Sequence, residues 1–159
     1  MKNKGITCLA SFIGGGLLAY GIMKKKNKKD LFLAWKKTEK FRNYYEMLGQ
    51  WISLKNSGNK IDQYFVDNNI KDIAIYGMGN VGMYLYEELK NSLVNVKYCI
   101  DKGSDMLSWE NISIKKPEDG LPLVDAIVVT ACFDYEAIKK ELEQYVDFTI
   151  LPLDEILFS

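Results

Sequence analysis

A short apolar run, three glycines and a helical pattern follow one another at residues 73–89 (IAIYGMGNVGMYLYEEL). Gly77, Gly79 and Gly82 have the spacing G-x-G-x-x-G, which in a strand-turn-helix unit receives a phosphate at the amino end of the helix. The spacing is short and glycine is common, so the glycines alone do not distinguish a nucleotide site from an ordinary turn. The predicted strands and helices around the glycines are needed to distinguish the two.

Beyond residue 70, apolar runs typical of strands alternate with amphipathic patterns typical of helices. Strands separated by helices favour a parallel sheet with right-handed crossovers and both faces covered. We therefore predict a doubly wound parallel α/β sheet of about five strands in the order 3-2-1-4-5. The predicted strands are residues 73–76, 94–100, 111–115, 125–131 and 148–153, and the predicted helices are residues 80–91, 135–145 and 154–158.

This setting gives each glycine a purpose. Gly77 ends the first strand where the chain must turn sharply, Gly79 lets a pyrophosphate approach the backbone, and Gly82 lets the helix lie close to the strand. Asp101 follows Gly82 by about 19 residues, at the end of the second strand, where a carboxylate can accept hydrogen bonds from ribose hydroxyls. The surroundings thus favour a nucleotide site.

Three stretches carry a resemblance to a known group: IAIYGMGNVG, the CID that ends the second strand, and PEDGLPLVDAIVVTA. Over about residues 60–157 the chain resembles the Rossmann-like NAD(P)-binding domains of bacterial surface-polysaccharide and sugar-nucleotide enzymes, including nucleoside-diphosphate-sugar epimerase-like proteins. The resemblance implies NAD as ligand, with NADP or a nucleotide-sugar left open because Lys102 follows Asp101. It implies a diphosphate held by Gly77, Gly79, Asn80, Val81 and Gly82, a ribose or sugar hydroxyl on Asp101, and a crevice bordered by Thr130 and Ala131.

The chain departs from the enzymes of that group in its catalytic parts. Tyr135 and Lys139 have the Tyr-x-x-x-Lys spacing in which a lysine lowers the tyrosine pKa, but they lie one helix too early. The substrate-binding domain of such enzymes has no counterpart. We expect a nucleotide-binding module without its own catalysis; a small NAD-dependent epimerase or oxidoreductase subunit and a ligand-free scaffold are the alternatives.

Residues 6–23 (ITCLASFIGGGLLAYGIM) contain no charged side chain. As a helix they span roughly 27 Å, just enough for a bilayer core. Five lysines follow at residues 24–29, without the small-residue cleavage site of a signal peptide. The sequence predicts a retained single-pass membrane helix with the carboxyl-terminal domain in the cytoplasm. A cleaved signal peptide and a buried or interfacial helix are the alternatives.

The predicted organisation has three parts. Residues 1–29 form the membrane anchor and its basic flank, residues 30–69 a helical lead-in, and residues 70–159 the nucleotide-binding domain. In the lead-in, apolar residues recur along one predicted helix face, which we expect to pack on the domain or on a second copy of the chain. These residues are Phe41, Tyr44, Tyr45, Leu48, Trp51 and Ile52.

Composition narrows the chemistry. The chain has no histidine, the commonest nitrogen ligand of zinc and the commonest general base, and we predict no metal site. Its 21 basic and 21 acidic residues balance, and the lysines after residue 23 favour topology and lipid headgroups over nucleic acid. Cys8, Cys99 and Cys132 lie far apart in apolar runs, which indicates buried thiols in a reducing, cytoplasmic setting.

Overall fold

The computed structural model describes the backbone of residues 3–103 and 108–159 and the side chains of residues 24–103 and 108–159. It divides into two compact units, Met1–Tyr44 and Tyr45–Ser159. Helix α1 (Asn3–Asn56) supplies all the helical structure of the first unit and the opening segment of the second. The two units are described separately below.

In the first unit the backbone is one uninterrupted stretch of α1. A separate lead-in helix was predicted to begin at residue 30, but α1 continues through that position. Residues 24–48 contain neither glycine nor proline, so no helix-breaking residue separates the anchor from the lead-in. The predicted membrane anchor, residues 6–23, is helical in its backbone, and its side chains lie outside the described residues. Among the residues described in full, no helix is long and apolar enough to cross a membrane.

The second unit is built on a six-stranded sheet with the order β3-β4-β2-β1-β5-β6. The five strands β4, β2, β1, β5 and β6 pair in parallel and follow the predicted order 3-2-1-4-5. The strands are β1 (Asp72–Tyr76), β2 (Asn95–Ile100), β3 (Ser108–Trp109), β4 (Ile112–Lys115), β5 (Ala126–Val129) and β6 (Thr149–Pro152).

Strand β3 was not predicted. It pairs antiparallel with β4 at the edge of the sheet, and Glu110, with φ +49°, makes the turn between the two strands. A two-residue strand is too short to show alternation, and a glutamate in this conformation lacks the Asn-Gly or Asp-Gly signature by which hairpins are recognised. The short length of β3 and the atypical turn residue explain why the sequence did not predict this strand.

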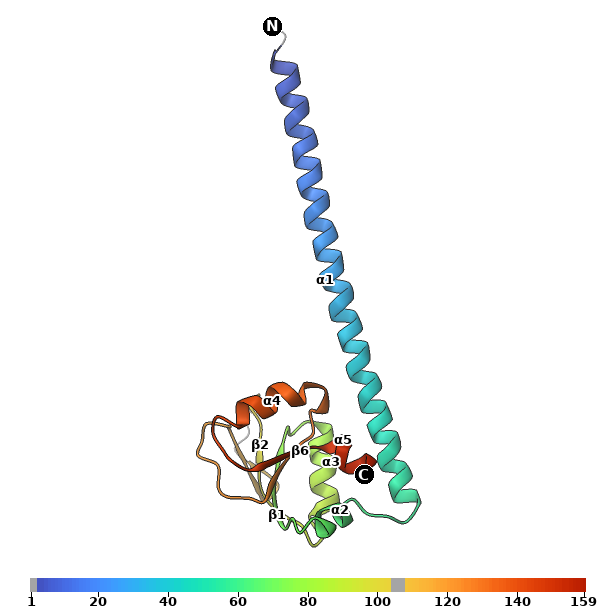
Figure 1. The fold of residues 1–159 in the computed structure, drawn as a ribbon, viewed down its shortest axis with the longest axis vertical. Coiled ribbons are helices and arrows are strands. Elements are labelled where there is room, and N and C mark those ends of the chain that lie inside the picture. The colour runs from blue at the N-terminus through green and yellow to red at the C-terminus, as the bar shows by residue number, and fades with distance from the viewer. Residues whose placement is uncertain (1–2, 104–107) are drawn as a thin grey trace. The chain divides into compact units, whose positions relative to one another are not determined.

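Helices cover both faces of the sheet (Figure 1). Helix α4 (Tyr135–Leu142) lies on one face, where Ile138 and Leu142 pack with Tyr76 and Tyr98 in a buried cluster. Helices α3 (Asn80–Leu89), α5 (Leu153–Phe158) and the short α2 (Asp62–Asp67) lie toward the other face, together with the end of α1. Because side chains alternate along a strand, both faces of β1 are apolar, as a central parallel strand requires.

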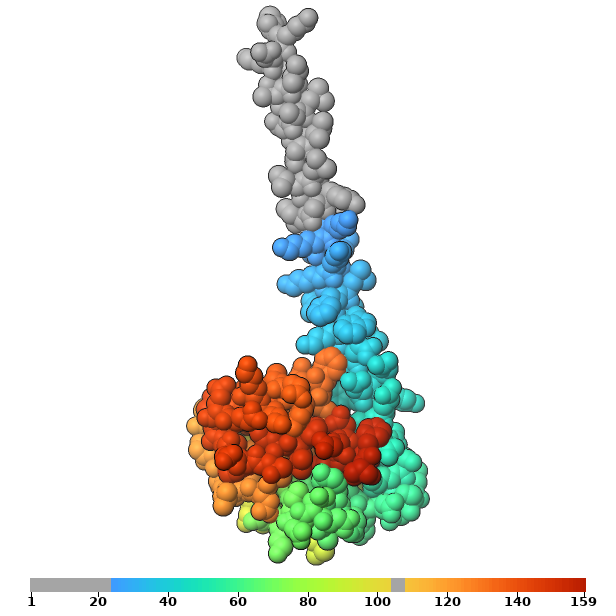
Figure 2. All heavy atoms as spheres, in the orientation of Figure 1, coloured from blue at the N-terminus to red at the C-terminus, as the bar shows by residue number. Residues whose placement is uncertain are grey.

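The last turns of α1 are anchored in the second unit. Met47 and Trp51 are buried, at 2% and 5% exposure, and Gln50 Nε2 donates a hydrogen bond of 3.1 Å to the Leu157 carbonyl of α5. Figure 2 shows this end of α1 beside the carboxyl-terminal residues. Tyr45 and Ile52, predicted on the same face as Trp51, are exposed instead. The apolar residues of this helix therefore form two faces rather than one.

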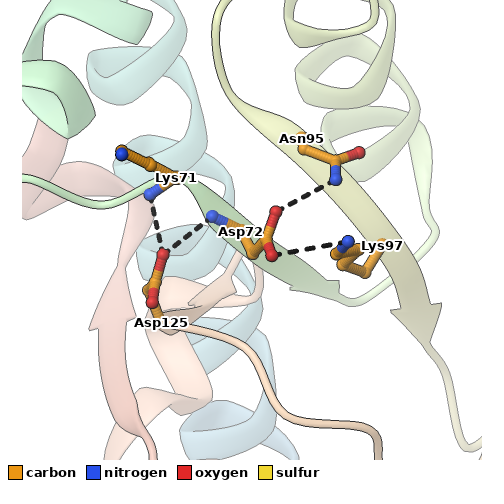
Figure 3. Close-up of polar contacts among 5 residues, drawn as sticks. All are labelled: Lys71, Asp72, Asn95, Lys97 and Asp125. Atoms are coloured by element: carbon orange, nitrogen blue, oxygen red, sulfur yellow. Dashed lines mark hydrogen bonds and ion pairs between the residues drawn. The ribbon is translucent and has the colours of Figure 1, made fainter.

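A polar network closes the amino end of the central strands (Figure 3). One oxygen of Asp125, Oδ2, accepts hydrogen bonds from the backbone N–H groups of Lys71 (2.8 Å) and Asp72 (2.9 Å). Asp72 in turn accepts from Asn95 Nδ2 at 3.0 Å and lies 3.4 Å from Lys97 Nζ. The two backbone hydrogen bonds lower the pKa of Asp125, since they favour its charged form. The network fixes where β1 begins against β5 and β2.

Candidate functional site

The turn after β1 requires glycine at its first position. Gly77 has φ +94°, and a Cβ added there would lie 2.8 Å from Thr130 Oγ1. The Gly77 N–H donates to the Ile100 carbonyl at 2.8 Å, so the turn stays hydrogen-bonded to the end of β2. Both the conformation and the space exclude a larger residue here.

Gly82, in the first turn of α3, is required for a different reason. A Cβ added to it would lie 2.0 Å from the Gly77 carbonyl oxygen and 3.0 Å from its carbon. These are backbone atoms, which cannot move aside as the end of a side chain would. Gly82 thus lets α3 lie directly against the glycine turn.

Gly79 differs from both. It has an ordinary conformation, φ −71° and ψ −174°, at the N-cap of α3, and an added Cβ would meet nothing within 4 Å. No residue within 24–103 and 108–159 therefore sterically requires glycine at this position, although glycine is favoured at a helix N-cap. Its missing side chain leaves the surface of the turn open.

The open surface leads to the amino end of α3. The first hydrogen bond of the helix runs from the Met83 N–H to the Gly79 carbonyl, at 3.0 Å. The N–H groups of Asn80, Val81 and Gly82 precede that bond, and such groups have no carbonyl partner within their own helix. They carry the positive end of the helix dipole, which favours an anion.

Asp101 holds the glycine turn in place. Its Oδ2 accepts a hydrogen bond of 2.7 Å from the Met78 N–H, and its Oδ1 accepts one of 2.9 Å from the Gly103 N–H. The sequence placed Asp101 beside the turn but did not predict this bond to the backbone. A carboxylate has about four lone-pair sites, so each oxygen retains one for a hydroxyl group.

Thr130, at the end of β5, supports the turn from the other side. It is buried, and its hydroxyl lies 3.0 Å from the Tyr76 carbonyl and 2.8 Å from the Gly77 carbonyl. The Thr130 N–H donates to the Tyr76 carbonyl at 3.0 Å as well. Its side chain therefore serves the turn, whereas the half-buried Ala131 follows it at the rim.

These residues meet at the point where the chain changes direction across the sheet. From β1 the chain passes through α3 to β2 on one side, and it later returns to β5 on the other side of β1. In open α/β sheets, ligands bind outside the carboxyl ends of the strands at such a switch point. The glycine turn lies at that end of β1.

Two titratable side chains near the turn are a lysine in an ion pair and a buried tyrosine. Lys102, next to Asp101, forms an ion pair with Glu141 of α4. Tyr76 lies buried at the end of β1, and burial raises its pKa, although the nearby Lys102 acts in the opposite direction. Lys102 would have to leave Glu141 to bind a 2′-phosphate.

Tyr135 and Lys139 are not arranged for proton transfer. The Tyr135 hydroxyl donates a hydrogen bond of 2.9 Å to the Ile150 carbonyl, and burial raises its pKa more than Lys139 lowers it. Lys139 Nζ lies 5.9 Å from the centre of the tyrosine ring, over its face. A phenolate base needs the opposite balance. Within residues 24–103 and 108–159, no cluster of three or more acidic or thiol side chains is placed to hold a metal ion.

Neither a scan against models of known protein families nor a search of curated proteins finds a match to this chain. The resemblance to NAD(P)-binding domains therefore remains a prediction. What the structure contributes is the mostly parallel α/β sheet and the geometry of the turn.

Proposed function

We propose that residues 70–159 form a Rossmann-like nucleotide-binding module that residues 6–23 hold at the cytoplasmic face of a membrane. The module binds the diphosphate of NAD(H), NADP(H) or a nucleotide-sugar at the amino end of α3. It presents or senses this ligand beside the machinery of cell-surface polysaccharide synthesis, and it performs no catalysis of its own.

The difference among the three glycines carries the proposal. Gly77 and Gly82 are explained by the fold, because added side chains would strike Thr130 and the Gly77 carbonyl. Gly79 has no such steric explanation among the described residues, since a Cβ added there would meet none of their atoms within 4 Å. Glycine is also favoured at a helix N-cap, but a glycine without a steric role, beside N–H groups that have no carbonyl partner within their helix, fits a site where a phosphate approaches the backbone.

The shape of the rest of the site agrees with a dinucleotide or nucleotide-sugar. Asp101 lies against the same turn and keeps lone pairs for a ribose diol, while the amides of Asn80 and Val81 belong to the first turn of α3. A diphosphate linked to a ribose would thus meet the helix end and the carboxylate together. Tyr135 gives its hydroxyl to a backbone carbonyl, which supports binding without turnover.

Membrane attachment rests on the amino-terminal sequence. Residues 6–23 contain no charge, and the lysines directly after them are exposed on α1. Lysines at this position favour the cytoplasmic side and contact with anionic headgroups.

One observation favours the alternative of a scaffold without ligand. Asp101 already satisfies the Met78 N–H, so the turn holds its shape with no bound molecule. A turn of this kind persists whether or not a nucleotide still binds. Ligand binding therefore has to be measured directly.

The test is equilibrium binding of NAD⁺, NADP⁺, ADP-ribose and UDP-glucose to the full chain in detergent micelles, followed by calorimetry and thermal unfolding. A bound ligand stabilises the folded state by about 2.7 kcal/mol at 100 times its Kd. We expect at least one of these probes to bind. In Gly79→Val and Asp101→Asn, binding should weaken at least about tenfold, or about 1.4 kcal/mol.

Gly49→Ala is the matched control, because a Cβ at Gly49 also meets nothing within 4 Å among the described residues but lies on α1, outside the glycine turn. It should leave binding unchanged. No thermal shift with any probe at millimolar concentration would favour the scaffold. Equal affinities of the wild type and Gly79→Val would overturn the proposed site.

A further inference from the structure

Helix α1 presents two apolar faces with different surroundings. The first consists of Tyr44, Met47, Trp51 and Leu54, spaced by three and four residues, and all four side chains are buried or half-buried. Met47 and Trp51 are nearly inaccessible. Met47, Trp51 and Leu54 belong to the second unit and are covered by other residues of that unit.

In the second face, here named the seam, Leu48 is half-buried and the other six members are exposed. Its members follow at intervals of three, four, three, four, three and four residues, which is the heptad spacing of positions a and d in a coiled coil. The seam consists of Leu31, Ala34, Thr38, Phe41, Tyr45, Leu48 and Ile52. Four of its large side chains are exposed: Leu31 by 71%, Phe41 by 62%, Tyr45 by 80% and Ile52 by 60%.

Charges are kept off the seam. Between residues 31 and 52 every charged side chain lies at another heptad position, and these residues are Lys36, Lys37, Glu39, Lys40, Arg42 and Glu46. A straight helix repeats every 3.6 residues, so a stripe that keeps a 3.5-residue repeat for three heptads matches a second helix that winds around it. A flat lipid surface imposes no such repeat.

A hollow lies next to the carboxyl-terminal end of the seam. It has a volume of about 700 Å³ and lies between α1 and α3, where Leu48, Ile52 and the half-exposed Tyr84 line it. Gly49 adjoins Leu48, and an added Cβ there would meet nothing within 4 Å. A mid-helix glycine costs about 1 kcal/mol relative to alanine, and none of the residues described with side chains uses the space that Gly49 leaves. The hollow, which Lys55, Glu87 and Glu88 also line, and the glycine leave the surface at this end of the seam uncovered by the described residues.

We propose that the seam pairs with the seam of a second copy of this chain in a parallel, two-stranded coiled coil. A second copy is the partner that carries the same repeat over the same length and therefore covers every layer. The parallel direction rests on the proposed function, because two amino-terminal anchors in one membrane set both helices in the same direction. The pairing itself does not depend on nucleotide binding.

The parallel arrangement brings one pair of like charges together. With Leu31 at position a, Lys37 occupies g and Arg42 of the other copy occupies the facing e position. Arg42 already pairs with Glu39 of its own helix, at 2.5 Å, which offsets part of the repulsion. The remaining repulsion provides a specific test, since Lys37→Glu converts it into an attraction only if the helices are parallel.

The experiment is sedimentation equilibrium of the full chain in density-matched detergent. The wild type should be a dimer, and Phe41→Glu should raise its dissociation constant at least about tenfold, because a charge then replaces an apolar d residue. Phe32→Glu is the matched control: Phe32 is 58% exposed on the same helix but lies off the seam. It should leave the dimer intact, and Lys37→Glu should tighten the dimer several-fold.

Three results would overturn the pairing: a monomeric wild type, a dimer that Phe41→Glu leaves unchanged, or equal losses in Phe41→Glu and Phe32→Glu. A monomer whose binding to phosphatidylglycerol vesicles depends on Phe41 would mean that lipid covers the seam. A dimer that Lys37→Glu weakens would contradict the parallel direction. NAD⁺ and UDP-glucose titrations of the same variants keep this test separate from the proposed function, because Phe41 lies far in the sequence from the glycine turn.

Discussion

At both ends of strand β1 an aspartate carboxylate accepts hydrogen bonds from backbone N–H groups, but the surroundings of the two carboxylates differ. At the amino end, Asp125 accepts the N–H groups of Lys71 and Asp72. At the carboxyl end, Asp101 accepts the N–H of Met78. In both places a carboxylate from a neighbouring part of the sheet fixes the backbone that enters or leaves the central strand.

The surroundings of the two carboxylates differ. At the amino end, Asn95 and Lys97 close the network around Asp72 (Figure 3). At the carboxyl end, the surface above Gly79 stays open and the first amides of α3 lie beside it. The comparison teaches that one end of the strand is closed by side chains of the chain itself, whereas the other is fixed in shape with an open surface among the described residues, which is where we propose that a nucleotide binds.

The largest effect is expected at Gly82. Gly82→Ala places a Cβ 2.0 Å from the Gly77 carbonyl, so α3 must move, and we expect a loss of about 3 kcal/mol in the free energy of unfolding. Gly79→Ala, which meets open space, should cost less than about 1 kcal/mol. Urea unfolding of the full chain measures both. Equal losses would mean that the two glycines do not differ as described.

A smaller effect is expected at Thr130. Thr130→Val keeps the shape of the side chain but removes the hydroxyl beside the Gly77 carbonyl, which should cost about 1–2 kcal/mol. Thr130→Ser keeps the hydroxyl and serves as the control. If Val and Ser destabilise the chain alike, packing rather than the hydrogen bond holds this side of the turn.

The smallest effect is expected at the amino end and depends on pH. The folded-state pKa of Asp125 is lowered from its ordinary value of 3.8, first by the Asp72 N–H and then by that of Lys71. Its contribution to stability is therefore present above about pH 4 and is lost as the pH falls through the lowered value. Between pH 5 and pH 3 the wild type should lose more stability than Asp125→Asn, as measured by thermal unfolding. Parallel curves would show that the charge of Asp125 is not what stabilises this end.

Much of the sheet could be predicted because its central strands are apolar on both faces. The runs at residues 73–76 and 125–131 gave β1 and β5, and their alternation with helices gave the strand order. The short edge strand β3 carried no such pattern. The division of α1 into two faces was also not predicted. Apolar residues spaced by three and four positions form one face in the sequence pattern, and only their different burial shows that they belong to two.

The sequence predicted where the candidate site lies but not the hydrogen bonds that hold it together. Glycine spacing and Asp101 were enough to place a turn, a helix end and a carboxylate together. That Asp101 and Thr130 bond to the turn itself depends on how β2 and β5 flank β1. Asp125 had a usable signal, since an aspartate directly precedes the apolar run of both central strands, in KDIAIY and VDAIVV.

The sequence by itself determined the parallel α/β arrangement and the glycine turn after the first strand. These follow from local periodicity and from the conformational freedom of glycine, which a single segment already contains. The tertiary structure alone decided which glycine has no steric role among the described residues. It also decided which backbone N–H groups bond to the carboxylates and which face of α1 has exposed side chains. Those properties depend on what lies within a few ångströms in space, and residues distant in the chain supply it.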